Sequence, residues 1–89
     1  MADMTVTKAA GQVNHAIMQH YTGHGPNLGQ MGAAALHLLQ VAFPAAHVNA
    51  VVVDIKYIDP NNAYKGVAGV SFKITSGTAI DPTQAKNAL

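Results

Sequence analysis

The spacing of apolar residues predicts two helices in the N-terminal half of the chain. Over residues 5–21 the apolar positions recur at steps of three and four, which places them on one face of a helix. A wider stripe with the same spacing predicts a second, more deeply buried helix over 28–43. This helix ends where Pro44 disfavours helical geometry at Phe43. The apolar positions of the first helix are Val6, Ala10, Val13, Ile17 and Tyr21.

From residue 48 onward, apolar and polar residues alternate, which is the pattern of half-buried β-strands. The alternation predicts one strand over 48–58 and a second over 66–75. Between them, the sequence Asp59-Pro60-Asn61-Asn62 is typical of a tight turn. The two strands therefore form an antiparallel hairpin.

The apolar faces of the two strands also predict how the hairpin pairs. They coincide only if Ile55 lies opposite Val70, because a slip of one residue would turn one apolar set to the other side. The same register places Asp54 across from Ser71 and diagonal to Lys73, which is a favourable polar arrangement.

A short C-terminal helix over 82–88 completes the predicted fold, since Asp81 and Pro82 are an N-cap and a first-turn proline. Residues 1–89 therefore form a single small α+β domain with two helices, a β-hairpin and a short helix. A lone hairpin is barely stable and has two open edges. We therefore expect oligomerisation, as a homodimer or larger ring, to complete the sheet.

The composition strengthens the expectation of self-association. Of the 89 residues, 49% are hydrophobic and only 10% are charged, well below the usual quarter. A chain this short buries a modest fraction of its surface, so apolar residues remain to be covered by another copy. The leading hypothesis is a non-enzymatic, homo-oligomeric binding or assembly module that presents loops to a ligand or protein partner.

The amino-acid composition and the N-terminal segment argue against nucleic acid partners, disulfides and export. The five cationic residues are scattered lysines without any arginine, which disfavours nucleic acid. Cysteine is absent, so neither disulfides nor thiolate metal sites are expected. The N-terminal segment lacks the basic region and apolar run of a signal peptide, and no stretch is long enough to span a membrane. We expect a cytoplasmic protein.

The most suggestive functional sequence is the glycine-rich turn before the second helix. Gly23, His24 and Gly25 lead into Asn27 as the N-cap, with Gln30 three residues later. Free backbone N–H groups at a helix N-terminus can hold a phosphate or carboxylate. The turn lacks the Gly-Lys-Ser/Thr ending of a P-loop, and the simpler interpretation is an ordinary helix–helix turn.

The tip of the predicted hairpin is the second candidate binding segment. Tyr64 and Lys65 follow two asparagines there, and such residues suit a small polar ligand or a protein partner. Together with the turn from Gly23 to Gln30, they define the alternative hypothesis, a binder of a nucleotide or other phosphorylated metabolite. The simpler interpretation is a solvated turn.

Catalytic and metal chemistry receive little support from the sequence. The chain has five histidines but no glutamate, which excludes a His-Glu-x-x-His zinc site, and we assign no metal or cofactor. His15, His20 and His24 could still meet across an oligomer axis, and the simpler interpretation is that they are surface or interface histidines. The serines lie in no nucleophile motif and no paired carboxylates occur. An enzyme would need a composite site between subunits.

Overall fold

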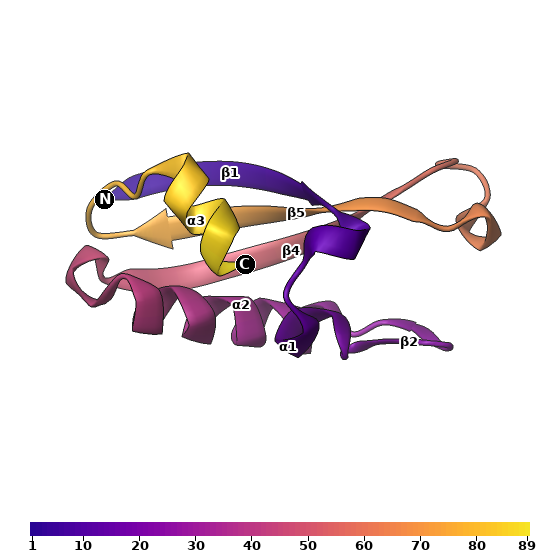
Figure 1. Ribbon diagram of the computed structural model, residues 1–89, viewed down its shortest axis with the longest axis horizontal. Coiled ribbons are helices and arrows are strands. Elements are labelled where there is room, and N and C mark those ends of the chain that lie inside the picture. Colours follow the sequence, from indigo (N-terminus) through magenta and orange to yellow (C-terminus); the bar gives the residue numbers. More distant parts are fainter.

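A three-stranded antiparallel sheet forms the centre of the computed structural model, which describes all residues 1–89 (Figure 1). The strands are β1 (Ala2–Ala9), β4 (Val48–Tyr57) and β5 (Val67–Ser76), in the order β1-β5-β4. The predicted α+β class is confirmed. The central position of β5 leaves one edge of β1 and one edge of β4 without a neighbouring strand.

The helix predicted over 5–21 is wrong, because the N-terminal residues form the third strand. Met4 and Val6 turn toward the core while Thr5 and Thr7 are exposed, an alternation of period two, and Val6 lies opposite Phe72 of β5. A single 3₁₀ turn, η1 (Ala10–Gln12), and a one-turn helix, α1 (His15–Met18), follow. The β-branched residues of 5–7 suit an extended strand, and the free edge of β5 supplies its hydrogen bonds.

Helix α2 (Leu28–Ala42) confirms the helix predicted over 28–43. Its N-cap is Asn27, whose side-chain oxygen accepts a hydrogen bond from the backbone N–H of Gln30 at 3.1 Å. Its last turn gives way to a 3₁₀ turn, η2 (Pro44–Ala46). The fully buried positions Met31, Ala35 and Leu39 follow the helical spacing.

The β4–β5 hairpin has the predicted register, with Ile55 opposite Val70 and Asp54 opposite Ser71. Asp54 forms its ion pair with Lys56 of the same strand at 3.2 Å rather than with a residue of β5. The hairpin does not stand alone, however. We expected another copy to donate the next strand of the sheet, but β1 of the same chain pairs with β5.

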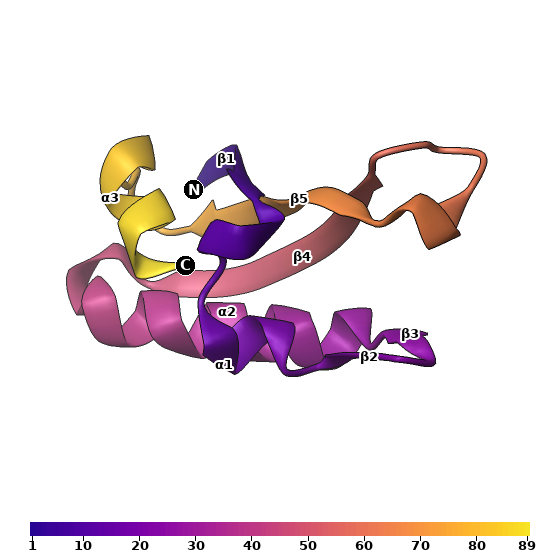
Figure 2. The same cartoon turned by 45° about the vertical axis from the view of Figure 1, so that its right-hand side comes forward.

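Helix α3 (Pro82–Ala88) confirms the predicted C-terminal helix, and the Asp81 side chain caps it by accepting from the N–H of Thr83. One side of the sheet carries the core, and the helices cover that side (Figure 2). Helix α2 runs back along β4, while α3 packs against β1. The fully buried side chains of the core include Phe72, Ile17, Met31, Leu39, Ile74, Leu89 and Val70.

Candidate functional site

A cleft of about 360 Å³ lies between two turns at one end of the molecule. One wall is the small hairpin of β2 (Tyr21–Thr22) and β3 (Gly25–Pro26), and the other is the connection between β4 and β5 (Figure 1). Both turns lie at this end because α2 and β4 are antiparallel neighbours, so the start of α2 lies near the end of β4. The cleft is lined by Tyr21, Thr22, Gly23, His24, Gly25, Pro26, Tyr57, Ala63 and Tyr64.

Local hydrogen bonds fix the β2–β3 wall. The Thr22 hydroxyl accepts from the backbone N–H of His24 at 3.3 Å and donates to the carbonyl oxygen of Gly25 at 3.4 Å. Gly25 has φ +114°, a conformation that side-chain-bearing residues rarely adopt. These features form a tight turn that holds the exposed His24 side chain beside the cleft.

The opposite wall is fixed by side chains that hydrogen-bond to the loop backbone. The side chain of Asn62 accepts from the N–H of Tyr64 at 3.0 Å, at the start of the 3₁₀ turn η3 (Ala63–Lys65). Lys65 pairs with Asp59 across the loop at 3.3 Å. Tyr64 is fully exposed at the edge of the cleft, although its backbone is held in place.

All three tyrosines of the chain line this cleft. Desolvation raises the pKa of the Tyr21 phenol, and the neighbouring Tyr57 phenol raises it further. Tyr21 and Tyr57 both line this cleft, one from β2 and one from the end of β4. No lysine or aspartate lines the cleft, so its polar groups are phenols, a threonine hydroxyl, an imidazole and backbone atoms.

The structure brings together four of the six residues that the sequence singled out as ligand-binding candidates. Gly23, His24, Gly25 and Tyr64 line the same cleft. The side chain of Asn27 instead caps α2, and Lys65 is paired with Asp59. Lys65 therefore does not contribute a positive charge to the lining of the cleft.

Sequence reasoning missed Tyr21 and Tyr57 as lining residues. Tyr21 is one of the apolar positions of the predicted N-terminal helix, which does not form, and Tyr57 lies near the end of the strand predicted over 48–58. The available signal was that both tyrosines directly adjoin turn sequences, one before Thr22-Gly23 and one before Ile58-Asp59. Loop-adjacent aromatic residues often line binding sites.

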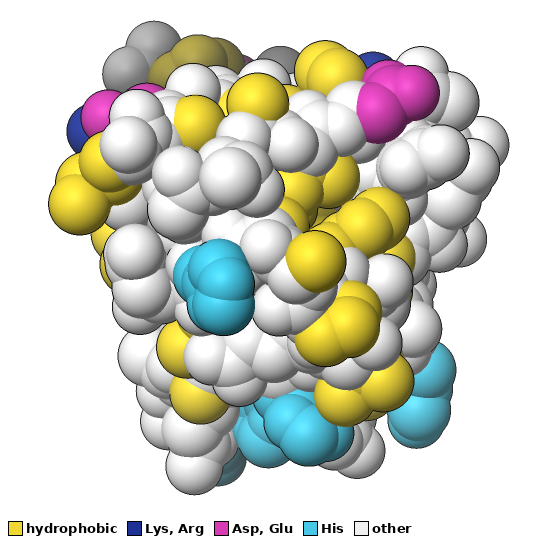
Figure 3. All heavy atoms as spheres, turned by 90° about the vertical axis from the view of Figure 1, so that its left-hand side faces the viewer, with side chains coloured by type: hydrophobic (Ala, Val, Ile, Leu, Met, Phe, Trp, Pro, Cys, Tyr) yellow, Lys and Arg dark blue, Asp and Glu magenta, His cyan; other side chains and the backbone are white.

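A second hollow lies at the opposite end of the molecule, around the end of α2 and the start of α3. Figure 3 shows hydrophobic side chains gathered across this end, with the few charged side chains near its upper margin. The hollow holds about 380 Å³. Its apolar lining residues are Ala42, Phe43, Pro44, Ala45, Ala46, Ala79 and Ile80.

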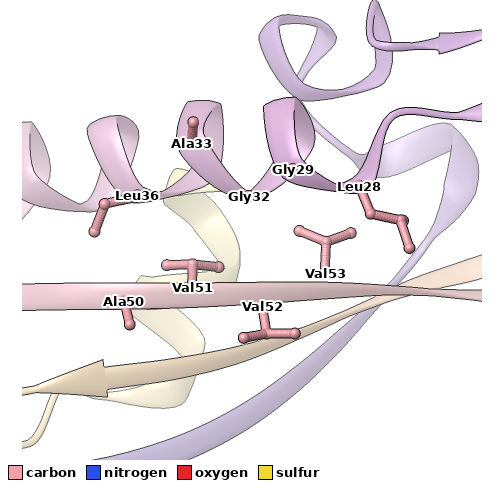
Figure 4. Close-up of a pocket in the computed structure, with 9 residues that line it drawn as sticks. All are labelled: Leu28, Gly29, Gly32, Ala33, Leu36, Ala50, Val51, Val52 and Val53. Carbon is pink, nitrogen blue, oxygen red and sulfur yellow. The ribbon is translucent and has the colours of Figure 1, made fainter.

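A third hollow, of about 430 Å³, is an apolar groove between α2 and β4 (Figure 4). Val51 and Val53 point from β4 toward α2, whereas Ala50 and Val52 point to the other side of the strand. All four line the same groove, which is possible because the groove follows the free edge of β4. The remaining lining residues are Leu28, Gly29, Gly32, Ala33 and Leu36 of α2.

The histidines do not gather into a metal-binding group. No group of three or more His, Cys, Asp or Glu side chains is placed to hold a metal ion. Ser76 donates its hydroxyl hydrogen to the carbonyl oxygen of Thr78 at 2.6 Å, a structural contact at the end of β5. None of the helices combines the length and the apolar character needed to cross a bilayer.

Comparison of the chain with protein-family models, with curated protein sequences and with solved structures gives no match. The geometry of the chain itself must therefore support any functional proposal.

Proposed function

We propose that the chain is a non-enzymatic assembly and binding module whose copies associate through the free edge of β4 and the apolar groove beside it. The observation that carries this proposal is the coincidence of these two features. An edge strand offers unpaired backbone N–H and C=O groups, and it is ordinarily protected by charge, proline or a covering segment. Here seven of the nine residues lining the groove along that edge are hydrophobic.

The sequence of β4 supports the same conclusion. From Val48 to Val53 the strand contains neither a charged residue nor a proline, and its first charges are Asp54 and Lys56. The side chain of Val52 is 62% exposed, on the side of the strand away from α2. Covering such a valine with another chain removes apolar surface from water, which favours association.

The arrangement that these features favour is a two-fold dimer in which β4 pairs with β4 of the other copy in antiparallel orientation. A two-fold interface uses the same patch on both copies, so a single apolar edge is sufficient. The two three-stranded sheets would join into one, and each groove would be covered by the other copy. The side chain of Leu28, which is 42% exposed in a single copy, would then be more deeply buried.

The test compares two equivalent substitutions, Val52→Lys and Val41→Lys. Val41 lies on α2 outside the groove and is 68% exposed, so the two changes place the same charge at equally exposed positions. Native mass spectrometry and light scattering at micromolar concentration should show an oligomer for the wild type and V41K, and a monomer for V52K. A monomeric wild type, or a V52K variant that associates like the wild type, would overturn the proposal.

A second candidate function is the binding of a small ligand. It is favoured by the cleft that collects three tyrosines and His24 at the end of the sheet. The hydroxyl and imidazole groups that line the cleft indicate which class of ligand it suits.

A further inference from the structure

The aromatic ring of Tyr64 has no role in stabilising the fold. Its side chain is fully exposed, although it is large and mostly apolar, and the backbone beneath it is fixed by Asn62 and by the Lys65–Asp59 ion pair. Removing this ring would take nothing from the core. An aromatic ring held on a rigid turn at the rim of a cleft offers a flat contact surface at little entropic cost.

The other polar side chains of the cleft carry hydroxyl and imidazole groups, which form hydrogen bonds. Tyr21 and Tyr57 present hydroxyl groups, each of which can donate and accept, and His24 adds ring nitrogens. The Thr22 hydroxyl is already engaged within its own turn. The cleft therefore offers phenol and imidazole hydrogen bonds beside an aromatic face.

The charges around the cleft argue against an anionic ligand. Neither lysine nor arginine lines it, Lys65 is paired with Asp59, and the chain has no arginine. Phosphates and nucleic acid backbones are usually bound by such cations. At about 360 Å³ the cleft lies at the small end of the range of ligand-binding pockets.

We propose that this cleft binds a neutral carbohydrate, with one sugar ring stacked on Tyr64 and its hydroxyl groups hydrogen-bonded to Tyr21, Tyr57 and His24. A sugar ring combines an apolar C–H face with many neutral hydroxyls, and these match the aromatic face and the phenols. The negative face of an aromatic ring attracts polarised C–H groups. This inference does not rest on the proposed association through β4.

The test uses the tyrosine fluorescence of the protein, which the absence of tryptophan leaves unobscured. The wild type is titrated with maltotriose, cellotriose, xylotriose and chitotriose, and with ATP and uridine for comparison. At least one trisaccharide should change the emission saturably at millimolar concentration, and neither ATP nor uridine should do so. Saturable binding of ATP or uridine alone, or no binding of any trisaccharide, would overturn the proposal.

Substitutions then locate the site. Tyr64→Ala should weaken binding about tenfold, as expected for the loss of one stacking contact, while Tyr64→Phe keeps the ring and should bind as the wild type does. His24→Ala should also weaken binding, whereas His37→Ala, on an exposed position of α2 outside the cleft, should not. V52K should bind like the wild type. Equal affinity of the wild type and Y64A, confirmed by shifts of backbone NMR signals, would refute the assignment.

Discussion

At the scale of single residues, two glycines determine how closely the elements approach. A Cβ atom at Gly32 of α2 would lie 2.8 Å from the carbonyl oxygen of Val51 in β4. A Cβ atom at Gly69 of β5 would lie 2.7 Å from the carbonyl oxygen of Lys8 in β1. Both neighbours are backbone atoms, which cannot move aside as a flexible side chain can. These glycines therefore allow α2 to lie against β4 and β1 to lie against β5.

We predict that Gly32→Ala destabilises the protein by about 1–2 kcal/mol, since the cost of overpacking exceeds the gain of roughly 1 kcal/mol in helix propensity. Urea denaturation followed by circular dichroism measures the change. Gly11→Ala is the control, because no atom lies within 4 Å of a Cβ at Gly11, and its stability should be unchanged or slightly higher. Equal stability of G32A and G11A would contradict the close approach of α2 to β4.

At the scale of elements, the sequence predicts those segments whose periodic pattern is bounded by clear end signals. Helix α2 lies between Asn27 and Pro44, and α3 follows Asp81 and Pro82, so both were predicted almost to the residue. Strands β4 and β5 have long alternations that fix each other's register. These elements are specified by local pattern and by capping.

Strand β1 was mispredicted because its segment contains two competing periods. Val6, Val13 and Ile17 are spaced for a helix. They are all buried, but Val6 lies in β1, Val13 between η1 and α1, and Ile17 in α1. The alternation of Met4 and Val6 with threonines has the period of a strand. The hydrogen bonds that this segment forms with β5 stabilise the strand over the helix. Tertiary pairing of this kind overrides a local helical spacing.

The candidate site was predictable only in its parts. The Gly-His-Gly turn and the segment of Tyr64 each stand out as loops in the sequence. Their meeting depends on the short connection from α2 to β4, which makes these elements antiparallel and brings their far ends to the same end of the molecule. Tyr21 lines the cleft because it belongs to β2. The helix predicted over 5–21 included Tyr21 and so concealed this role.

We predict that Thr5→Cys combined with Lys73→Cys forms a disulfide under mild oxidation, because Thr5 and Lys73 are cross-strand partners in the β1–β5 pair. The chain has no other cysteine to compete. Thr7→Cys with Lys73→Cys is the matched control: Thr7 is paired with Ser71, so its sulfur should remain a free thiol. Thiol counting by mass spectrometry distinguishes them, and a disulfide formed equally in both would contradict the register of β1.

At the scale of the whole molecule, the two main apolar surfaces would produce dimers of different shape. The Cα trace measures 40 × 19 × 18 Å, and β4 runs along the longest direction (Figure 1). The groove beside β4 therefore lies on a long side, whereas the hollow around Phe43 and Ile80 lies at an end (Figure 3). Only the long side combines an apolar surface with the unpaired backbone of an edge strand.

We predict that small-angle X-ray scattering of the oligomer will show copies associated side by side. A dimer formed along β4 keeps a maximum dimension close to that of one copy, whereas a dimer formed through the apolar end would be about twice as long. Antiparallel pairing of β4 would also place the tyrosine clefts of the two copies at opposite ends of the joined sheet, where both stay open to ligand. A nearly doubled length would instead assign the contact to the Phe43 end. In that case V52K would leave the oligomer intact, so the two measurements check each other.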